Sequence, residues 1–180
     1  MTDTDWRSDV LKFWFALKPE QWWKTDEALD ERIRQDFLKL WAEKRQLPPD
    51  AFLTDPLTAV AGVILFDQFP RNMFRGHADA YSTDPLALAI AKGAVDKGLD
   101  EALAPAERKF LYMPFQHSEN LDDQNRALLL FTALGDVEQI KYAKHHRAII
   151  ERFGRFPHRN AILGRPSRPD EVAAGADKPW

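Results

Sequence analysis

Cysteine is absent from this 180-residue sequence, which excludes disulfides, thiolate metal sites and cysteine nucleophiles. No hydrophobic run approaches the ~20 residues that a membrane-spanning helix needs, and the longest extends only from Ala59 to Phe66. The first residues, MTDTDWRSD, contain neither the basic start nor the apolar stretch of a secretion signal. We therefore expect a cytoplasmic protein with no membrane attachment.

Glycine is scarce, and the 8 glycines form no recognisable ligand-binding loop. The nucleotide-binding patterns GxGxxG and GxxxxGK[ST] do not occur, and neither does the GxSxG pattern of serine hydrolases. The zinc pattern HExxH and the calcium loop DxDxDG are missing too. We accordingly expect no cofactor and no metal, and the sequence leaves open whether the protein is an enzyme.

The composition is that of an ordinary globular protein, with 44% apolar and 29% charged residues. Six tryptophans and twelve phenylalanines predict an aromatic core. The length fits one helical domain, residues 1–174, followed by a loose tail, residues 175–180. A net charge of −3 argues against a general nucleic-acid coat, so nucleic acid ranks lowest among possible partners.

Helical periodicity dominates the chain, and no segment alternates convincingly as a β-strand. The predicted fold is all-α, with about seven helices in antiparallel pairs joined by short loops. Prolines are expected to end helices, for example at Pro19 and Pro70, and Gly135 and Gly154 to close two others. The predicted helices begin near residues 5, 25, 56, 85, 105, 122 and 137, with a short last helix after residue 167.

The tetrapeptide Thr-Asp-Pro-Leu occurs twice, at residues 54–57 and 83–86. Aspartate before proline is typical of a helix N-cap with proline at the first helical position. We therefore expect Asp55 and Asp84 each to cap a helix, and we attribute the match to shared capping chemistry rather than to a repeat. The adjacent Trp22 and Trp23, predicted in a loop, either fill the edge of the core or line a ligand pocket.

A dense basic segment lies between His145 and Arg168, where six arginines and three histidines accompany one acid, Glu151. It is interleaved with phenylalanines, which makes it too apolar for a merely solvated surface. Its Phe-Pro-His-Arg-Asn string echoes the earlier FDQFPRN string at residues 66–72. In both strings an Arg-Asn pair offers forked donors suited to carboxylate or phosphate. Alternatively, these pairs satisfy exposed helix carbonyls.

Two further features indicate a polar site. Arg147 falls on the apolar stripe of its predicted helix, where an unpaired charge is very unfavourable, so it needs a partner such as Glu119 or Asp67. A structural ion pair to a neighbouring helix is the other interpretation. His117 and Glu119 lie two residues apart and could act as a general base and its orienting group. Equally, Glu119 could cap the next helix or pair with Arg147.

These motifs carry a resemblance to a known family. The strings DQFPRN and RFGRFPHRN, together with FWF at residues 13–15, FRG at 74–76, HSE at 117–119 and LGR at 163–165, closely resemble the bacterial family called domain of unknown function 924. The resemblance extends from about Val10 to Glu171. It implies an all-helical fold of antiparallel helix pairs, like that of tetratricopeptide-repeat proteins, and it implies no particular activity.

Two functional hypotheses follow. In the first, the motifs converge in space on a polar pocket that binds a small anionic ligand. In the second, stacked helix pairs form a scaffold whose groove binds a peptide or a protein partner, and the motifs are structural joints between helices. The weak catalytic candidates are His117 and Glu119. The candidate ligand-binding residues are Asp67, Arg71, Asn72, Arg75, His117, Glu119, His146, Arg147, Arg155, His158, Arg159 and Asn160. The oligomeric state is not predicted.

Overall fold

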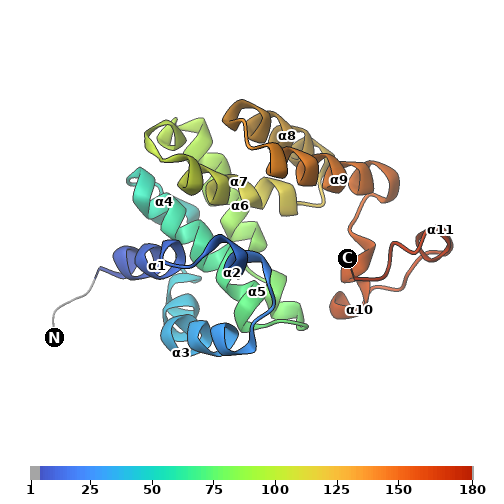
Figure 1. Ribbon diagram of the computed structural model, residues 1–180, viewed down its shortest axis with the longest axis horizontal. Helices are drawn as coiled ribbons and strands as arrows, with labels where there is room; N and C mark the ends of the chain where they lie inside the picture. The colour runs from blue at the N-terminus through green and yellow to red at the C-terminus, as the bar shows by residue number, and fades with distance from the viewer. Residues whose placement is uncertain (1–4, 180) are drawn as a thin grey trace.

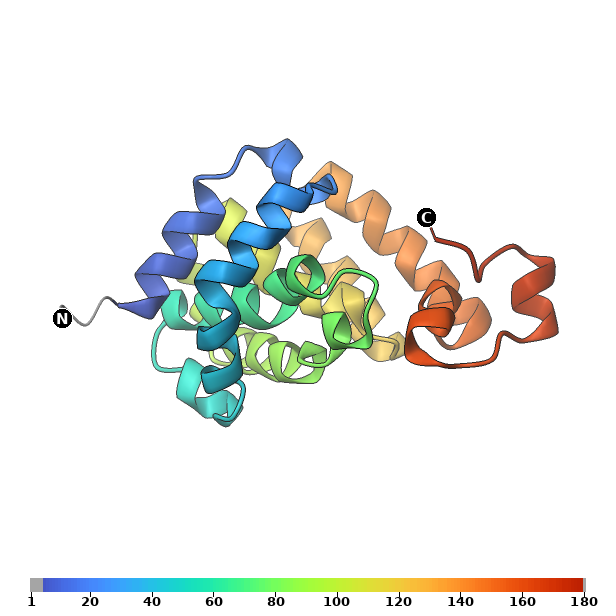
Figure 2. The ribbon, with the colours of Figure 1, turned by 90° about the horizontal axis from the view of Figure 1, so that it is seen from below.

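A computed structural model of the chain describes residues 5–179, so the predicted start of the chain and Trp180 of the predicted tail lie outside the described residues. Helices run from α1 at one end of the molecule to α10 and α11 at the other (Figure 1). Figure 2 shows the same order after a quarter turn. The α-helices are α1 (Trp6–Phe15), α2 (Pro19–Trp23), α3 (Glu27–Lys44), α4 (Pro56–Val63), α5 (Phe69–Met73), α6 (Asp84–Asp96), α7 (Pro105–His117), α8 (Leu121–Leu134), α9 (Val137–Phe153), α10 (Asn160–Leu163) and α11 (Pro169–Ala173).

The fold is all-helical as predicted, and within residues 5–179 no strand forms. The prediction of about seven helices was too low, because segments assigned to connections are themselves helical. Pro19 does not only follow α1 but begins α2, which contains Trp22 and Trp23. Proline is favoured at the first position of a helix, where a missing N–H removes no hydrogen bond. Consecutive helices α7, α8 and α9 pack against one another.

Several helix ends are fixed by the local signals that the sequence predicted. Asp5 and Asp55 accept hydrogen bonds from the backbone N–H groups of Arg7 and Thr58. Gly135 and Gly154 close α8 and α9 with φ angles of 76° and 73°, in the left-handed region that disfavours other residues. These caps confirm the predicted ends of α8 and α9.

Asp84 does not cap its helix, which corrects the prediction for the second Thr-Asp-Pro-Leu string. It is the first residue of α6, its N-cap is Thr83, and no side chain caps the helix. The Asp84 carboxylate instead accepts two hydrogen bonds from Arg71. The Asp of the same four letters therefore caps α4 in the first string but does not cap α6 in the second.

Pro70 does not end its helix either, because the chain adopts a π-helical turn at Ile64–Gln68 just before it. The N–H of Phe69 bonds to the carbonyl of Ile64, and α5 continues through Pro70. Proline has no N–H for the carbonyl four residues earlier, which belongs to Phe66. The Thr83 hydroxyl donates to that carbonyl at 2.7 Å instead. The wide turn and the Thr83 hydroxyl thus allow the helix to continue past Pro70.

The core surrounds α4, whose residues from Thr58 to Val63 are all buried. Aromatic side chains from α1, α5 and α7 meet beside it. Trp14 contacts Phe69 and Phe110 edge to face, with ring centroids 5.8 Å and 5.5 Å apart. Because the π-helical turn directly continues α4, it places a polar residue, Asp67, in the centre of this packing.

A membrane-spanning helix is absent from the described part of the chain. No helix between residues 5 and 179 is both long and apolar enough to cross a bilayer.

Candidate functional site

Asp67, on the π-helical turn, is a carboxylate with no solvent exposure. One of its oxygens lies 2.7 Å from Nδ1 of His117, and the other accepts a hydrogen bond from Gln68. Burial opposes ionisation of this group, but His117 and Arg71 together hold the pKa of Asp67 below its ordinary value. A buried carboxylate bound to one ring nitrogen fixes the orientation of the imidazole and leaves Nε2 as the nitrogen available to a ligand.

Arg71 links this carboxylate to α6. Its guanidinium donates to both Asp84 oxygens at 2.8 Å and 3.0 Å, and to the backbone carbonyl of Asp67 at 2.6 Å. Burial alone would lower the pKa of Arg71, but Asp84 and Asp67 raise it above its ordinary value. Arg71 is thus a paired structural cation, and it occupies both oxygens of Asp84.

Arg159, just before α10, is less well paired, although only 7% of it is exposed. Its Nη2 donates to the carbonyl of His117 at 3.1 Å, and its Nη1 lies 4.0 Å from Asp84. No hydrogen-bond partner faces its buried Nε. The guanidinium lies over the rings of Tyr81 and Phe156, at 4.5 Å and 4.7 Å. Burial and the nearby charge of Arg71 lower the pKa of Arg159 below its ordinary value.

These groups surround a cavity of about 320 Å³ between the start of α6, the end of α7 and α10. Its polar rim contains Arg159, His117 and Ser118, with the carboxylates of Asp84 and Glu119 beside them. The remaining lining residues are mostly apolar and comprise Tyr81, Pro85, Leu88, Pro114 and Leu163. Arg71 does not line the cavity, but it binds the same Asp84 carboxylate that Arg159 approaches, so Asp84 connects the two Phe-Pro motifs.

Glu119 fastens the C-terminal segment to the end of α7. Its carboxylate accepts from the backbone N–H of Phe156 at 2.6 Å and from Arg165 at 2.8 Å and 3.2 Å. Burial opposes ionisation, but Arg165 and Phe156 hold the pKa of Glu119 below its ordinary value. Glu119 is therefore not the group that orients His117, because the carboxylate next to Nδ1 of His117 is that of Asp67.

Arg155 and Asn160 both bind Glu171 of α11. Arg155 donates to the two Glu171 oxygens at 2.9 Å and 2.7 Å, and Asn160 lies 3.2 Å from one of them. The hydrogen bonds from Arg155 lower the pKa of Glu171 to about 2. These two motif residues therefore have the structural role of the second hypothesis, because they connect the C-terminal loop to α11.

The low pKa of Glu171 predicts that acid weakens its ion pair with Arg155. A carboxylate whose pKa falls from its ordinary 4.5 to about 2 on folding stabilises the protein fully above that ordinary value. The contribution is lost progressively as the pH falls towards 2. We expect the difference in urea midpoint between wild type and Glu171→Gln to be largest at neutral pH and to shrink in acid. A difference that does not change with pH would contradict this assignment, and Glu138→Gln is the surface control.

Asn72 and Arg75 lie in a different cluster. Both donate to the buried carboxylate of Asp30 on α3, at 2.9 Å for Asn72 and at 2.8 Å and 3.0 Å for Arg75. They join α5 and its following turn to α3. Neither residue lines the cavity.

Arg147 also lies outside the cluster. It is about one-third exposed and binds Asn125 of α8 at 2.6 Å and Glu151 of its own helix at 3.1 Å. The prediction that it pairs with Glu119 or Asp67 is wrong, because the neighbouring α8 supplies a neutral amide instead. This contact matches the alternative interpretation of a joint between neighbouring helices.

His146 and His158 are both near Phe156, with ring centroids 5.5 Å and 5.7 Å from it. Burial lowers the pKa of His146 to about 3 and that of His158 to about 4. Both rings are therefore neutral at physiological pH, and neither adds positive charge to the site.

Two site residues escaped the sequence analysis, namely Asp84 and Tyr81. Asp84 had been assigned to helix capping, and a tyrosine before a capping motif carries no recognisable signal. Their role follows only from the fold, which brings the start of α6 against Arg71 and Arg159.

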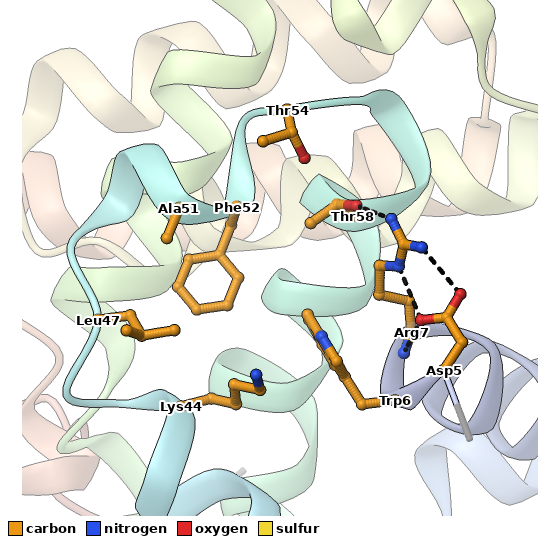
Figure 3. Close-up of a pocket in the computed structure, with 9 residues that line it drawn as sticks. All are labelled: Asp5, Trp6, Arg7, Lys44, Leu47, Ala51, Phe52, Thr54 and Thr58. Atoms are coloured by element: carbon orange, nitrogen blue, oxygen red, sulfur yellow. Dashed lines mark hydrogen bonds and ion pairs between the residues drawn. The ribbon is translucent and has the colours of Figure 1, made fainter. Parts of the chain in front are cut away.

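A larger surface pocket of about 430 Å³ lies at the other end of the molecule, between α1, α3 and α4. Figure 3 shows one of its two cations, Arg7, bound to Asp5 and Thr58. Asp55 is also within 3.3 Å of Arg7. The other cation, Lys44, lies 5.4 Å from the Trp6 ring. Because Arg7 is already paired with two carboxylates, this pocket has no buried, incompletely paired arginine like Arg159. For metals, no group of three or more His, Asp or Glu side chains in residues 5–179 is placed to hold an ion.

Comparisons with known proteins agree with the arrangement of helices. Residues 10–174 match a family described as bacterial protein of unknown function, DUF924. The solved structure of a protein of unknown function, ATU0120, from Agrobacterium tumefaciens is 39% identical in sequence and superposes with a TM-score of 0.86. The match covers 95% of this chain and 97% of that one. No protein with a curated description is similar enough in sequence to match.

Proposed function

The chain belongs to the bacterial family DUF924, whose function is unknown, and from the geometry of its own cavity we propose that it binds a small anionic ligand. The observation that carries the proposal is the state of Arg159. Its charge is buried, its Nε has no hydrogen-bond partner, and the Asp84 oxygens closest to it are already bound by Arg71. A buried cation with unused donors beside a cavity suits a carboxylate or phosphate.

The lining of the cavity narrows the class of ligand. Arg159 is the unsatisfied donor in the lining, since the Ser118 hydroxyl already donates to Asp123 at 2.6 Å. Pro85, Leu88 and Leu163 form an apolar part of the wall. The two lining carboxylates do not oppose an anion strongly, because Asp84 binds Arg71 and Glu119 binds Arg165. We therefore favour a carboxylic acid with a short aliphatic or aromatic body over a bare inorganic anion.

General acid–base catalysis on the bound anion is a second candidate function, and the Asp67–His117 contact at 2.7 Å favours it. A buried carboxylate at Nδ1 orients the imidazole so that Nε2 is the nitrogen that can exchange a proton with a ligand, which is the arrangement of a general acid or base. His117 lines the same cavity as Arg159. In this proposal Arg159 holds the anionic group and His117 removes a proton from the ligand or from a water beside it.

Thermal unfolding with anions tests the binding proposal. An anion that binds only the native state at about 100 times its Kd should raise the melting temperature by roughly 5–10 °C. We expect benzoate or isovalerate to do this, and phosphate or sulfate to do it more weakly, at ionic strength matched with chloride. Arg159→Ala should lose the response and should melt at the wild-type temperature or above, because it removes an incompletely paired charge.

Arg155→Ala is the matched control, since it removes an arginine from the same motif but strands the buried Glu171. It should lose stability and keep the anion response. The rival function is a scaffold in which a tetratricopeptide-repeat-like groove binds a peptide in the cytoplasm. It would be supported if no anion raised the melting temperature of wild type and if Arg159→Ala melted several degrees lower, because the arginine would then be a structural contact between segments.

A further inference from the structure

A second cavity, of about 270 Å³, lies between α2, α7 and α9 on the other side of His117. Its volume is close to the lower end of the range for small-molecule sites, about 300–1,000 Å³. Trp23 and Tyr142 line it and are about half-exposed, so its mouth has two aromatic rings. Of the two tryptophans that the sequence placed together, Trp22 packs on Phe110 at 4.9 Å, and Trp23 lines the cavity.

Two buried glutamines line the same cavity from facing helices. Gln116 of α7 and Gln139 of α9 are each only 4% exposed. The side-chain oxygen of each has no hydrogen-bond partner in the protein; the same is true of Gln124, which lines neither cavity. Buried amide oxygens are usually satisfied, so a pair of them at one cavity indicates that something else supplies the donors. A carboxamide also presents N–H donors. Two carboxamides together can therefore bind a ligand whose edge has both hydrogen-bond donors and acceptors.

The cavity contains no strong charge. No Asp, Glu, Lys or Arg side chain lines it, and burial lowers the pKa of the lining His146 to about 3, so that this ring is neutral. The other lining histidine, His117, lies 2.7 Å from the Asp67 carboxylate, which balances any charge on that ring. Met113 completes the apolar part of the wall. The cavity at Arg159, by contrast, is lined by three ionised groups. An uncharged occupant is therefore expected in the second cavity.

We propose that this second cavity binds a neutral, planar heteroaromatic ring whose edge carries both hydrogen-bond donors and acceptors. The ring lies against Trp23 and Tyr142 at the mouth, and its polar edge bonds to Gln116 and Gln139. Aromatic walls with a few convergent polar groups are the usual composition of such sites. The inference does not rest on anion binding, because the two cavities share only His117.

Adenine, nicotinamide and uracil, each uncharged at neutral pH, are the probes. Saturation-transfer NMR detects binding to the full chain, and calorimetry gives the Kd. We expect at least one probe to bind wild type, and Gln139→Leu and Gln116→Leu each to weaken it tenfold or more, which corresponds to about 1.4 kcal/mol. Neither variant should melt below wild type without ligand, because each removes an amide that the protein itself leaves unsatisfied.

Gln124→Leu is the matched control. Its side chain is fully buried like theirs, but its Nε2 donates to the carbonyls of Gln116 and Ser118 at 2.7 Å and 2.6 Å. It should lose stability and keep the probe affinity, and Gln35→Leu on the surface of α3 replaces it if it does not fold. The proposal is overturned if no probe binds, if neither cavity variant weakens binding, or if both variants lose as much stability as Gln124→Leu. The two proposals can fail independently. Arg159→Ala should keep the affinity for the heteroaromatic probe, and Gln139→Leu should keep the rise in melting temperature with benzoate.

Discussion

Asp84→Ala is expected to lower the free energy of unfolding by about 3–5 kcal/mol, since it removes the carboxylate that two largely buried arginines share. Arg71 loses both of the hydrogen bonds that Asp84 accepts, at 2.8 Å and 3.0 Å, and keeps the Asp67 carboxylate, 3.5 Å away. Arg159 loses the carboxylate that lies 4.0 Å away. The two arginines then lie near each other with no carboxylate between them. Urea unfolding followed by far-UV dichroism measures the loss.

The chain contains a matched control for this variant in its other Thr-Asp-Pro-Leu string. Asp55→Ala removes a helix cap with the same neighbours on both sides, together with a surface ion pair to Arg7 at 3.3 Å. The loss expected from a cap is about 1 kcal/mol. Adding Arg159→Ala to Asp84→Ala should restore part of the stability, which a double-mutant cycle quantifies. If Asp84→Ala lowers the free energy of unfolding no more than Asp55→Ala does, the group of Asp84, Arg71 and Arg159 stabilises the fold no more than a helix cap does.

Asp67→Ala is expected to have a comparable effect, also about 3–5 kcal/mol, because it removes a fully buried carboxylate from between two partners. His117 loses the acceptor 2.7 Å from its Nδ1, and the side-chain amide of Gln68 loses its acceptor too. Asp67→Asn keeps the volume and one acceptor, so its loss should be smaller, roughly 1–3 kcal/mol. Both values come from the same urea titrations.

The ring nitrogens of His117 give a readout that separates orientation from stability. In wild type we expect the ¹⁵N chemical shift of a protonated Nδ1, and in Asp67→Asn a loss of this preference for Nδ1. Asp30→Ala is the control, because it removes another buried carboxylate that binds motif residues, Asn72 and Arg75. It should lose stability without changing the His117 spectrum. A wild-type ring with its proton on Nε2 would contradict the proposed dyad.

Local signals predicted much of the fold, because helix caps act within a few residues of the chain. Asp5, Asp55, Gly135 and Gly154 end or begin helices as their types and positions indicate. Pro70 shows the limit of such signals. A proline disrupts a helix because its ring clashes with the carbonyl four residues earlier and leaves that carbonyl without a donor. Here the π-helical turn widens the helix, and Thr83, which comes later in the sequence, supplies the donor.

The site was predicted only in part, for a similar reason. Arginine–asparagine pairs identify a place with many donors, but not which donors find partners in the protein. Arg155 finds Glu171 and is satisfied, whereas the Nε of Arg159 is not. Arg147 looked unpaired on its helical stripe, yet Asn125 of the next helix accepts its hydrogen bond. These differences depend on distances between helices, which no spacing in the sequence encodes.

The position of Arg159 late in the chain has a consequence for synthesis on the ribosome. The Asp67, Arg71 and Asp84 groups belong to segments that the ribosome makes well before Phe156 and Arg159. Phe156 is held by Glu119, and Arg159 donates to the carbonyl of His117. A nascent chain that ends before these residues therefore lacks this wall of the cavity. In our proposal, ligand binding at this cavity would then require a chain translated at least through Arg159.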